Sequence, residues 1–493
     1  MKCSTMKSKL WSIQWILLAI FTVGLSSCKD DDNSSSVTPY NPGQPVEITD
    51  FTPETGGGNT RVVVYGKNFG TDTSLLKLTV GGKEAKIISV LSDCMYAIVP
   101  QKAYKGNFVL TVGEGEQAQT VEAEKKFNYE RQMVVSALCG NMDEKGNYDV
   151  KDGRFNDCGG LAEPTWLSFD PKNKDILYIA QDNGKNIRVL DLANEYLYTG
   201  LRSGDSGMGR MRTITWTLDG DTMIVSNDQG DKNYGNNFYI KRKTDMEPYA
   251  AFNTGTQTLQ VGNACNGSAI HPVNGELYYN SYSLGDVYKF DYWSAHKELG
   301  FDYTKREHLY TIQDRDWEFN IVIHPTGNYA YLVMINKHYI MRTDYDWKKK
   351  RFGNPYLFCG SVGNAAWVDG TGNSARLSTP YQGVFVKNKD YVANKAEDEY
   401  DFYFADRNNH CIRKLTPDGS VTTFAGRGGV GDPNGYTNGG LRSEARFRQP
   451  CGLAYDETTE TFYVGDVNNH RIRKIAMEEP DEEATGETDI DNN

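Results

Sequence analysis

The sequence is poor in the residues and motifs that many enzyme and metal sites require. Only seven histidines occur in 493 residues, and Gly-x-Ser-x-Gly, His-Glu-x-x-His and Gly-x-x-x-x-Gly-Lys-Ser/Thr motifs are all missing. No Cys-x-x-Cys pair or Cys/His spacing for zinc occurs either. These absences argue against the nucleophile-elbow hydrolases, the zinc proteases and the P-loop enzymes. A glycosidase or polysaccharide lyase stays open, because two carboxylates from distant segments leave no linear motif.

Basic charge is also scarce. The chain carries 53 Lys and Arg against 65 Asp and Glu, for a net charge of −12. The segment 478–493 contains eight acidic residues and no basic one, and we expect it to be a disordered, solubilising tail. The rest of the chain is mildly acidic, without the basic field that a nucleic-acid partner requires.

One apolar run lies near the N-terminus, but it is short. Trp11 to Leu25 follows three lysines and is shorter than the about 20 residues that a membrane-spanning helix needs. It predicts a signal peptide over residues 1–27. The sequence Leu25-Ser26-Ser27-Cys28 resembles the lipobox of bacterial lipoproteins, which implies that Cys28 carries a lipid anchor. An ordinary cleaved signal is the alternative.

The segment after Cys28 adds to this resemblance. Lys29-Asp30-Asp31-Asp32-Asn33 resembles the export signal of Bacteroidetes-type lipoproteins, which implies a lipid-anchored protein exposed on the outer membrane. A simple solvated tether is the alternative. Residues 28–45 are predicted to be a lipidated, flexible tether, since they are rich in Ser, Pro and Asn.

Of nine cysteines, seven remain if Cys3 is cleaved off and Cys28 is lipidated. Cys139 and Cys158 flank one loop, and either a disulfide or two buried thiols fit this spacing.

Residues 46–130 are predicted to form short alternating strands separated by glycine turns. The run Pro53 … Gly66-Lys67-Asn68-Phe69 … Val80-Gly81-Gly82 … Val99-Pro100 resembles the IPT/TIG module. The resemblance implies an immunoglobulin-like β-sandwich without catalytic residues.

The rest of the chain is built on a repeat. A nonapeptide occurs at Asp406–Lys414 and, sixty residues later, at Asp466–Lys474, and matching segments precede both copies. A long-period repeat indicates units that stack on one another. Six segments align as first strands, and each is followed by further short strands. They begin at Thr165, Arg212, Asn266, Phe319, Tyr381 and Cys451.

This pattern predicts an all-β chain, in which the β-sandwich is followed by a six-bladed β-propeller over residues 131–477. We expect Met133–Leu138 to close the ring as the outer strand of the last blade, beside Arg471–Ala476. The run Asp369-Gly370 … Ala375-Arg376-Leu377 … Pro380 … Asp406-Arg407-Asn408-Asn409-His410-Cys411-Ile412-Arg413 resembles the NHL repeat. NHL propellers include binding scaffolds and a few enzymes, so the fold does not choose between them.

Metal sites have little support in the sequence. Some NHL-type lyases bind zinc through channel histidines, but in this chain only three histidines lie outside repeated positions, without supporting spacing: His296, His308 and His338. Calcium could bind at Asp228–Asn233 or Asp314–Asp316, although both are better explained as turns. We expect no cofactor.

Recurrence separates scaffold from site. Asp406 and Arg413 recur one blade later, so we expect the aspartate to accept from backbone in a turn and the arginine stem to pack between blades. Function should lie in unlike residues at the channel mouth, where aromatic rings, amides and guanidinium groups suit a sugar. The alternative is that they fill the channel. The predicted ligand-binding residues are Trp166, Arg212, Asn266, Trp317, Tyr381 and Gln449.

Together these features resemble the accessory glycan-binding lipoproteins of starch-utilisation-type systems. The resemblance implies non-catalytic capture of a polysaccharide or glycoconjugate and its transfer to an outer-membrane transporter complex. A propeller enzyme that acts on a glycan and a protein-interaction scaffold are the two alternatives.

Overall fold

The structure is a computed structural model in which the chain divides into two compact units between Glu130 and Arg131. Within the part of the chain that is described, no helix is long and apolar enough to cross a membrane. The predicted signal peptide, Cys28 and most of the acidic tail lie outside that part. The described residues are 38–182, 186–202, 207–229, 235–242, 257–261, 264–281, 284–291, 306–312, 318–429 and 433–479.

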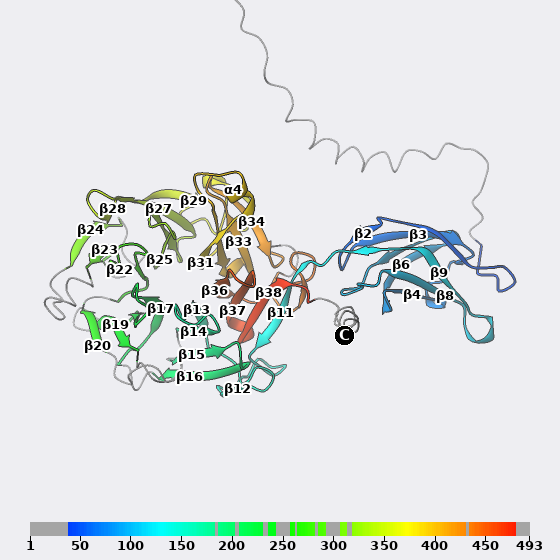
Figure 1. Ribbon diagram of the computed structural model, residues 1–493, viewed down its shortest axis with the longest axis horizontal. Helices are drawn as coiled ribbons and strands as arrows, with labels where there is room; N and C mark the ends of the chain where they lie inside the picture. Colours follow the sequence, from blue (N-terminus) through cyan, green and yellow to red (C-terminus); the bar gives the residue numbers. More distant parts are fainter. Residues whose placement is uncertain are drawn as a thin grey trace, which may run out of the picture. The chain divides into compact units, whose positions relative to one another are not determined.

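The first unit contains two antiparallel four-stranded sheets (Figure 1). One has the order β1 (Glu47–Thr52), β3 (Arg61–Lys67), β7 (Cys94–Ile98), β6 (Lys86–Leu91). The other has the order β5 (Lys83–Glu84), β4 (Leu76–Val80), β8 (Asn107–Val112), β9 (Gln119–Lys126). In β8 the side chains of Phe108, Leu110 and Val112 are buried and those between them are not, as period-2 alternation requires. The short strands β2 (Thr55–Gly56) and β10 (Asn128–Tyr129) pair in parallel.

The end of the predicted tether is folded. Tyr40 packs against the core of the first unit, and its hydroxyl donates to the carbonyl of Gln117 at 2.6 Å. The amide of Asn68 donates to the carbonyls of Asn41 and Gln44, both at 2.8 Å. Residues 40–45 therefore belong to the first unit, because burial of the tyrosine ring and these hydrogen bonds outweigh the polar composition.

The second unit contains, among its described residues, six sheets arranged around one axis like propeller blades (Figure 1). The strands of each blade run in order from the innermost outward. Blade 1 has β13 (Pro164–Phe169), β14 (Ile176–Gln181), β15 (Asn186–Asp191), β16 (Tyr196–Arg202) and β12 (Gly153–Arg154). Blade 2 has β17 (Met211–Trp216), β18 (Thr222–Asn227), β19 (Gly235–Lys241) and β20 (Gln257–Val261). Blade 3 has β21 (Ser268–Ile270), β22 (Leu277–Ser281), β23 (Asp286–Phe290) and β24 (Glu307–Thr311).

The remaining blades follow the same plan. Blade 4 has β25 (Phe319–Ile323), β26 (Tyr329–Met334) and β27 (Tyr339–Asp346), with β28 (Arg351–Phe352) and β29 (Tyr356–Gly360) both on β27. Blade 5 has β31 (Pro380–Lys387), β32 (Tyr400–Asp406), β33 (Cys411–Leu415), β34 (Ser420–Ala425) and β30 (Gly370–Thr371). Blade 6 has β36 (Pro450–Asp456), β37 (Thr461–Asp466), β38 (Arg471–Met477), β11 (Met133–Cys139) and β35 (Gly439–Gly440). Each innermost strand packs against that of the next blade, and the all-β prediction is confirmed.

The ring closes as predicted, because β11 from the start of the unit pairs antiparallel with β38 from its end. Val135 lies opposite Ile475, so the last blade gains its outer strand from the N-terminal side. Glu478, which follows β38, forms a hydrogen bond with the residue before β11. Its backbone N–H donates to the carbonyl of Gln132 at 2.9 Å, and its side chain is buried. The predicted tail therefore begins too early, since Glu478 belongs to the fold.

The repeated nonapeptide is scaffold. The carboxylate of Asp406 accepts from the backbone N–H of Ser378 at 2.7 Å, as predicted, and from the amide of Asn409 at 2.8 Å. It also accepts from Arg413 at 2.8 Å, and both charged side chains are fully buried. The arginine thus does more than pack its stem between blades. Asp466 and Arg473 repeat the pair at 3.0 Å in blade 6.

Cys139 and Cys158 are both buried free thiols. A hydrogen bond from Cys139 lowers the pKa of the Cys158 thiol to about 7, against the opposing effect of burial. Of the two states that the sequence left open, the structure has the pair of thiols.

Candidate functional site

The predicted channel-mouth residues do not form one open ring. A blade presents its faces to the two neighbouring blades, and strand side chains point alternately to those faces. Trp166 follows this rule: it is 7% exposed, lies in the apolar packing between blades 1 and 2, and donates its indole N–H to the carbonyl of Ile214 at 3.1 Å. Its ring therefore packs between blades 1 and 2.

Gln449 also belongs to the scaffold. Its side-chain nitrogen donates to Asn408 at 3.0 Å, and its side-chain oxygen accepts from Asn468 at 2.7 Å. The glutamine therefore connects the nonapeptide turns of blades 5 and 6. Trp317 lies outside the described residues.

Arg212 and Tyr381 do meet, where the innermost strands of blades 2 and 5 begin. The guanidinium carbon lies 5.6 Å from the centroid of the tyrosine ring, and both side chains are 2% exposed. The guanidinium donates to Asp228 at 2.7 Å and lies 3.7 Å from Glu318. Burial by itself would lower the pKa of Arg212, but Tyr381 and the surrounding carboxylates outweigh it and raise the pKa.

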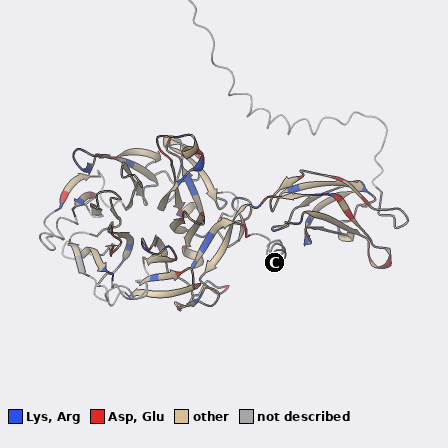
Figure 2. Ribbon diagram, in the orientation of Figure 1, with Lys and Arg blue, Asp and Glu red and all other residues tan. Residues whose placement is uncertain are grey.

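Arg210 covers this cluster from the solvent side. Its guanidinium group donates two hydrogen bonds of 2.9 Å to the carboxylate of Asp182 and lies 3.0 Å from that of Asp228. Its side chain is 40% exposed, whereas those two carboxylates are almost completely buried. Basic and acidic segments are both seen among the ribbons that surround the propeller axis (Figure 2). We call Asp182, Arg210, Arg212, Asp228, Glu318 and Tyr381 the axial cluster.

Asn266 and Asn320 are the unusual polar residues in this region. They are 0% and 1% exposed, and among the described residues neither the oxygen nor the nitrogen of either amide has a hydrogen-bond partner. Asn266 lies just before β21 and Asn320 lies on the neighbouring innermost strand β25, and a β-carbon on Gly267 would lie 2.9 Å from the α-carbon of Asn320. Arg212 Nε and Arg407 Nε are likewise buried without a hydrogen bond. Each unsatisfied group costs about 1–3 kcal/mol, so water or a ligand is expected to satisfy them.

The axis is bridged next to the axial cluster. Gln382 follows Tyr381 along β31, and its side-chain oxygen accepts from the backbone N–H groups of Leu167 at 2.8 Å and Leu453 at 2.9 Å. Its nitrogen donates to the carbonyl of Leu167 at 2.7 Å. One amide thus connects blades 5, 1 and 6, and the filled-channel alternative holds for this residue.

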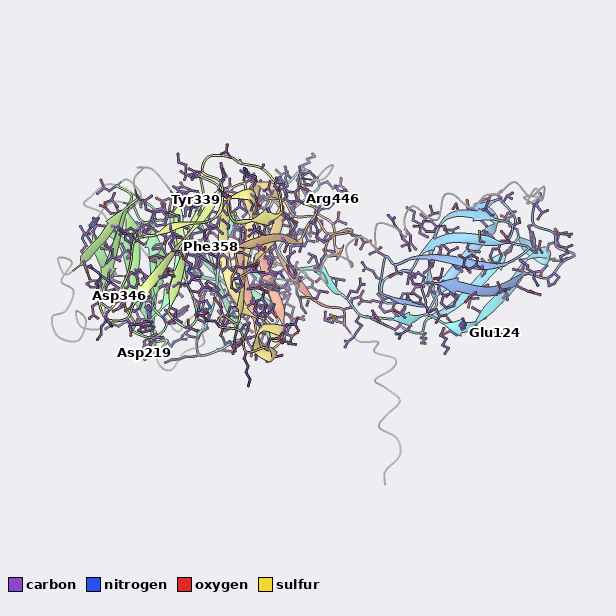
Figure 3. All side chains as sticks on the ribbon, turned by 90° about the horizontal axis from the view of Figure 1, so that it is seen from above. Glu124, Asp219, Tyr339, Asp346, Phe358 and Arg446 are labelled. Carbon is purple, nitrogen blue, oxygen red and sulfur yellow. The ribbon has the colours of Figure 1, made fainter. Side chains whose placement is uncertain are left out.

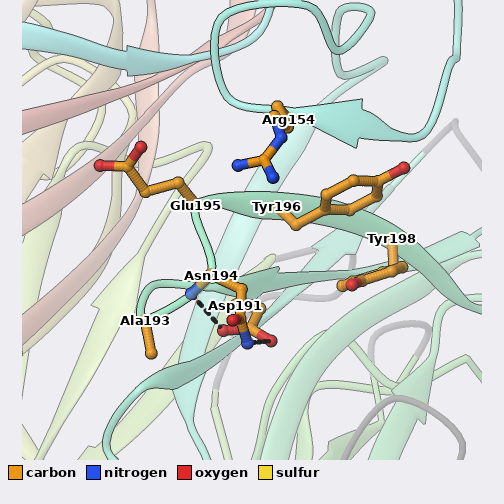
Figure 4. A pocket seen from close by; sticks show the side chains of 7 residues that line it. All are labelled: Arg154, Asp191, Ala193, Asn194, Glu195, Tyr196 and Tyr198. Carbon is orange, nitrogen blue, oxygen red and sulfur yellow. Dashed lines mark hydrogen bonds between the residues drawn. The ribbon is translucent and has the colours of Figure 1, made fainter.

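A surface hollow of about 580 Å³ on blade 1 is a weaker candidate (Figure 4). Tyr196 and Tyr198 stack on each other at 4.4 Å, so each ring covers a face of the other. Asp191 in the same hollow accepts two hydrogen bonds from Asn194. In this hollow the two tyrosine rings therefore cover each other, and the carboxylate of Asp191 is occupied by Asn194.

The predicted calcium ligands are only partly described. Asp228 is occupied by Arg210 and Arg212, and residues 230–233 and 314–316 lie outside the described ranges. Within those ranges, no group of three or more His, Cys, Asp and Glu side chains is placed to hold a metal ion.

Comparison with known proteins identifies the family to which the chain belongs. The IPT/TIG domain family matches residues 45–129, and the NHL repeat family matches residues 447–475. An auxiliary nutrient binding protein from Bacteroides thetaiotaomicron is 45% identical, with a TM-score of 0.79 over 90% of this chain and 100% of that one. The chain belongs to the same family.

Two further Bacteroides proteins show the range of this TIG and NHL-propeller family. An auxiliary nutrient binding protein from Bacteroides ovatus is 37% identical, with a TM-score of 0.65 over 90% of this chain and 100% of its own. A Bacteroides thetaiotaomicron protein described as "Putative phosphatase" is 41% identical, with a TM-score of 0.81 over 90% and 99% of the two chains. Human NHL repeat-containing protein 2 is 34% identical over 112 residues, which are 22% of this chain and only 14% of that protein.

Proposed function

We propose that the protein captures a hydroxyl-rich nutrient, a polysaccharide or glycoconjugate, without converting it, beside the axial cluster. The observation that carries this proposal is the pair of unsatisfied buried amides, Asn266 and Asn320. An amide offers a donor and an acceptor in fixed geometry, and a sugar hydroxyl can answer both. Two relatives described as auxiliary nutrient binding proteins support the same role.

The test replaces one of the two asparagines by leucine, which has a similar size but no amide group. Asn266→Leu should weaken binding of neutral soluble polysaccharides at least about tenfold while leaving the melting temperature unchanged or higher, because the substitution removes an unsatisfied amide. Calorimetry against a polysaccharide panel measures the affinity. Asn128→Leu on β10 of the first unit is the control and should change neither quantity. Unchanged binding in Asn266→Leu, or loss of folding together with binding, would count against the site.

The cellular setting is a proposal of its own. The lipobox resemblance at Cys28 and the acidic residues after it support an outer-membrane lipoprotein exposed on the cell surface, which transfers its ligand to a transporter complex of the starch-utilisation type. Fatty-acid labelling should depend on Cys28, and protease added to intact cells should cleave the wild-type protein. A Cys28→Ala variant that still takes up label would overturn the anchor.

Catalysis is the competing function, because one relative is described as "Putative phosphatase". In this chain the axial carboxylates Asp182 and Asp228 are held by arginines, which suits positioning more than proton transfer. Overnight incubation with polysaccharides and sugar phosphates should release neither reducing ends nor inorganic phosphate. Release of either product would replace capture by catalysis.

A further inference from the structure

The insertion that interrupts the repeat in blade 5 builds one wall of a groove. Residues 388–399 connect β31 to β32 and include the helix α4 (Lys389–Ala393). Together with the turn after β25 and the end of β27, they enclose a groove of about 870 Å³ between blades 4 and 5. Asp346, at the end of β27, lies on the face of the propeller opposite to Tyr339, at the start of that strand (Figure 3).

The blade 4 wall of the groove carries a fixed aromatic ring. Trp347 is 45% exposed, yet its indole N–H donates to Asn328 at 3.0 Å and its ring packs edge-on against Tyr345 at 4.8 Å. Tyr391 and Tyr400 line the groove from the insertion side. A large ring that is held in place and half open to solvent binds with little loss of side-chain entropy.

The insertion is held against blade 4 by Asp398. Its carboxylate accepts from the hydroxyl of Tyr329 at 2.8 Å and from the backbone N–H of Tyr400 at 3.0 Å, and it lies 3.3 Å from the ring of His324. The groove therefore has a defined shape.

The lining of the groove is acidic. It contains four carboxylates, from Glu397, Asp398, Glu399 and Asp418, against one guanidinium group, that of Arg342; outside the lining, Lys387 lies 3.2 Å from Glu399. Arg342 is occupied: it donates to Asp344 at 2.7 Å and stacks on the ring of Tyr329 at 3.9 Å. Carboxylates accept hydrogen bonds from hydroxyl groups and repel anions.

We infer that this groove is a second glycan site, specific for a neutral, hydroxyl-rich chain. The Trp347 ring covers the C–H face of a sugar, and the acidic wall accepts its hydroxyl hydrogens while excluding uronate and sulfated chains. This inference rests on the proposed function, from which it takes the glycan as ligand. It adds a site on a different part of the propeller, with its own residues and its own charge preference.

Calorimetry on the full chain tests the groove with hexasaccharides of glucose, mannose, xylose and N-acetylglucosamine, and with hexagalacturonate as the charged member. Wild type should bind one neutral hexasaccharide at two sites. Trp347→Ala should lose one site, with at least about tenfold weaker binding there, whereas Trp347→Phe should retain it within about threefold because the ring remains. Tyr65→Ala, an exposed tyrosine of the first unit, should retain both sites.

The outcomes separate the two proposals. If Trp347→Ala keeps two sites while Asn266→Leu loses one, the groove is overturned and the axial site stands. If Trp347→Ala loses a site and Asn266→Leu loses none, the groove stands and the axial assignment falls. No binding of any neutral hexasaccharide by wild type overturns both. Tight binding of hexagalacturonate that Trp347→Ala abolishes overturns the charge preference, and with it the proposed ligand class.

Discussion

Asp406 is one of the fully buried charged residues of the propeller scaffold. Its carboxylate and the guanidinium group of Arg413 are both fully buried and 2.8 Å apart. Removing one member of such a pair leaves an uncompensated charge in the interior. Asp406→Asn should therefore lower the free energy of unfolding of the second unit by about 3 kcal/mol, as measured by urea denaturation.

An exposed ion pair is the matched control. Lys151 and Asp157 lie 2.9 Å apart with 56% and 74% of their side chains exposed. Asp157→Asn should change the same free energy by less than about 1 kcal/mol. Equal effects of the two substitutions would show that burial does not decide the contribution of Asp406.

The sequence showed which repeated residues have a structural role, but it did not show in which direction the side chains near the strand ends point. Asp406 recurs one blade later as Asp466, so its structural role followed from repetition. The direction of Trp166 depends on a shift in strand pairing between Pro164 and Trp166, and similar shifts occur at the heads of β17, β31 and β36. One extra residue at a strand head exchanges the faces to which the next side chains point, and no linear motif marks it.

At the scale of elements, the insertion 388–399 depends on one carboxylate. Burial alone would raise the pKa of Asp398, but hydrogen bonds from His324 and Tyr329 outweigh it and lower the pKa below the ordinary 3.8. The ionised form therefore stabilises the fold above pH of about 4, and this contribution is lost as pH falls through the lower folded pKa. Asp398→Asn should lower the melting temperature near neutral pH, by an amount that shrinks as the pH approaches 3.

Glu397→Gln, at the exposed neighbour on the same insertion, provides the comparison and should show a smaller change. A melting-temperature difference for Asp398→Asn that stays constant from pH 7 to pH 3 would contradict the anchoring role of the carboxylate. The role of residues 388–399 could not be predicted from their own sequence, because it depends on Tyr329, which is distant along the chain.

A second prediction for a single element concerns the stability contributed by the closing strand β11. Val135 is 1% exposed beside Ile475, whereas Ala137 of the same strand is exposed. Val135→Asp would bury an unpaired charge and should destabilise the second unit by more than about 4 kcal/mol in urea denaturation. Ala137→Asp should stay within about 0.5 kcal/mol of wild type. The closure was predictable because strand-like residues stood before the first repeat without a blade of their own.

For the whole molecule, the two units share no hydrophobic core among the described residues, which predicts two unfolding transitions. Phe108 lies in the core of the first unit, and Val135 lies in a core of the second. Because the proposed glycan sites lie in the propeller, a neutral hexasaccharide at 100 times its Kd should stabilise only the second unit, by about 2.7 kcal/mol per site. Differential scanning calorimetry with and without the hexasaccharide measures both transitions.

Core substitutions assign the two transitions to their units before the ligand is added. Phe108→Ala should destabilise the first unit by about 3–5 kcal/mol and leave the other transition in place, because the cavity it creates lies in the sandwich. Val135→Asp should do the reverse. A ligand-induced shift of the transition that Phe108→Ala lowers would move glycan binding to the first unit, and would contradict both the axial site and the groove beside Trp347.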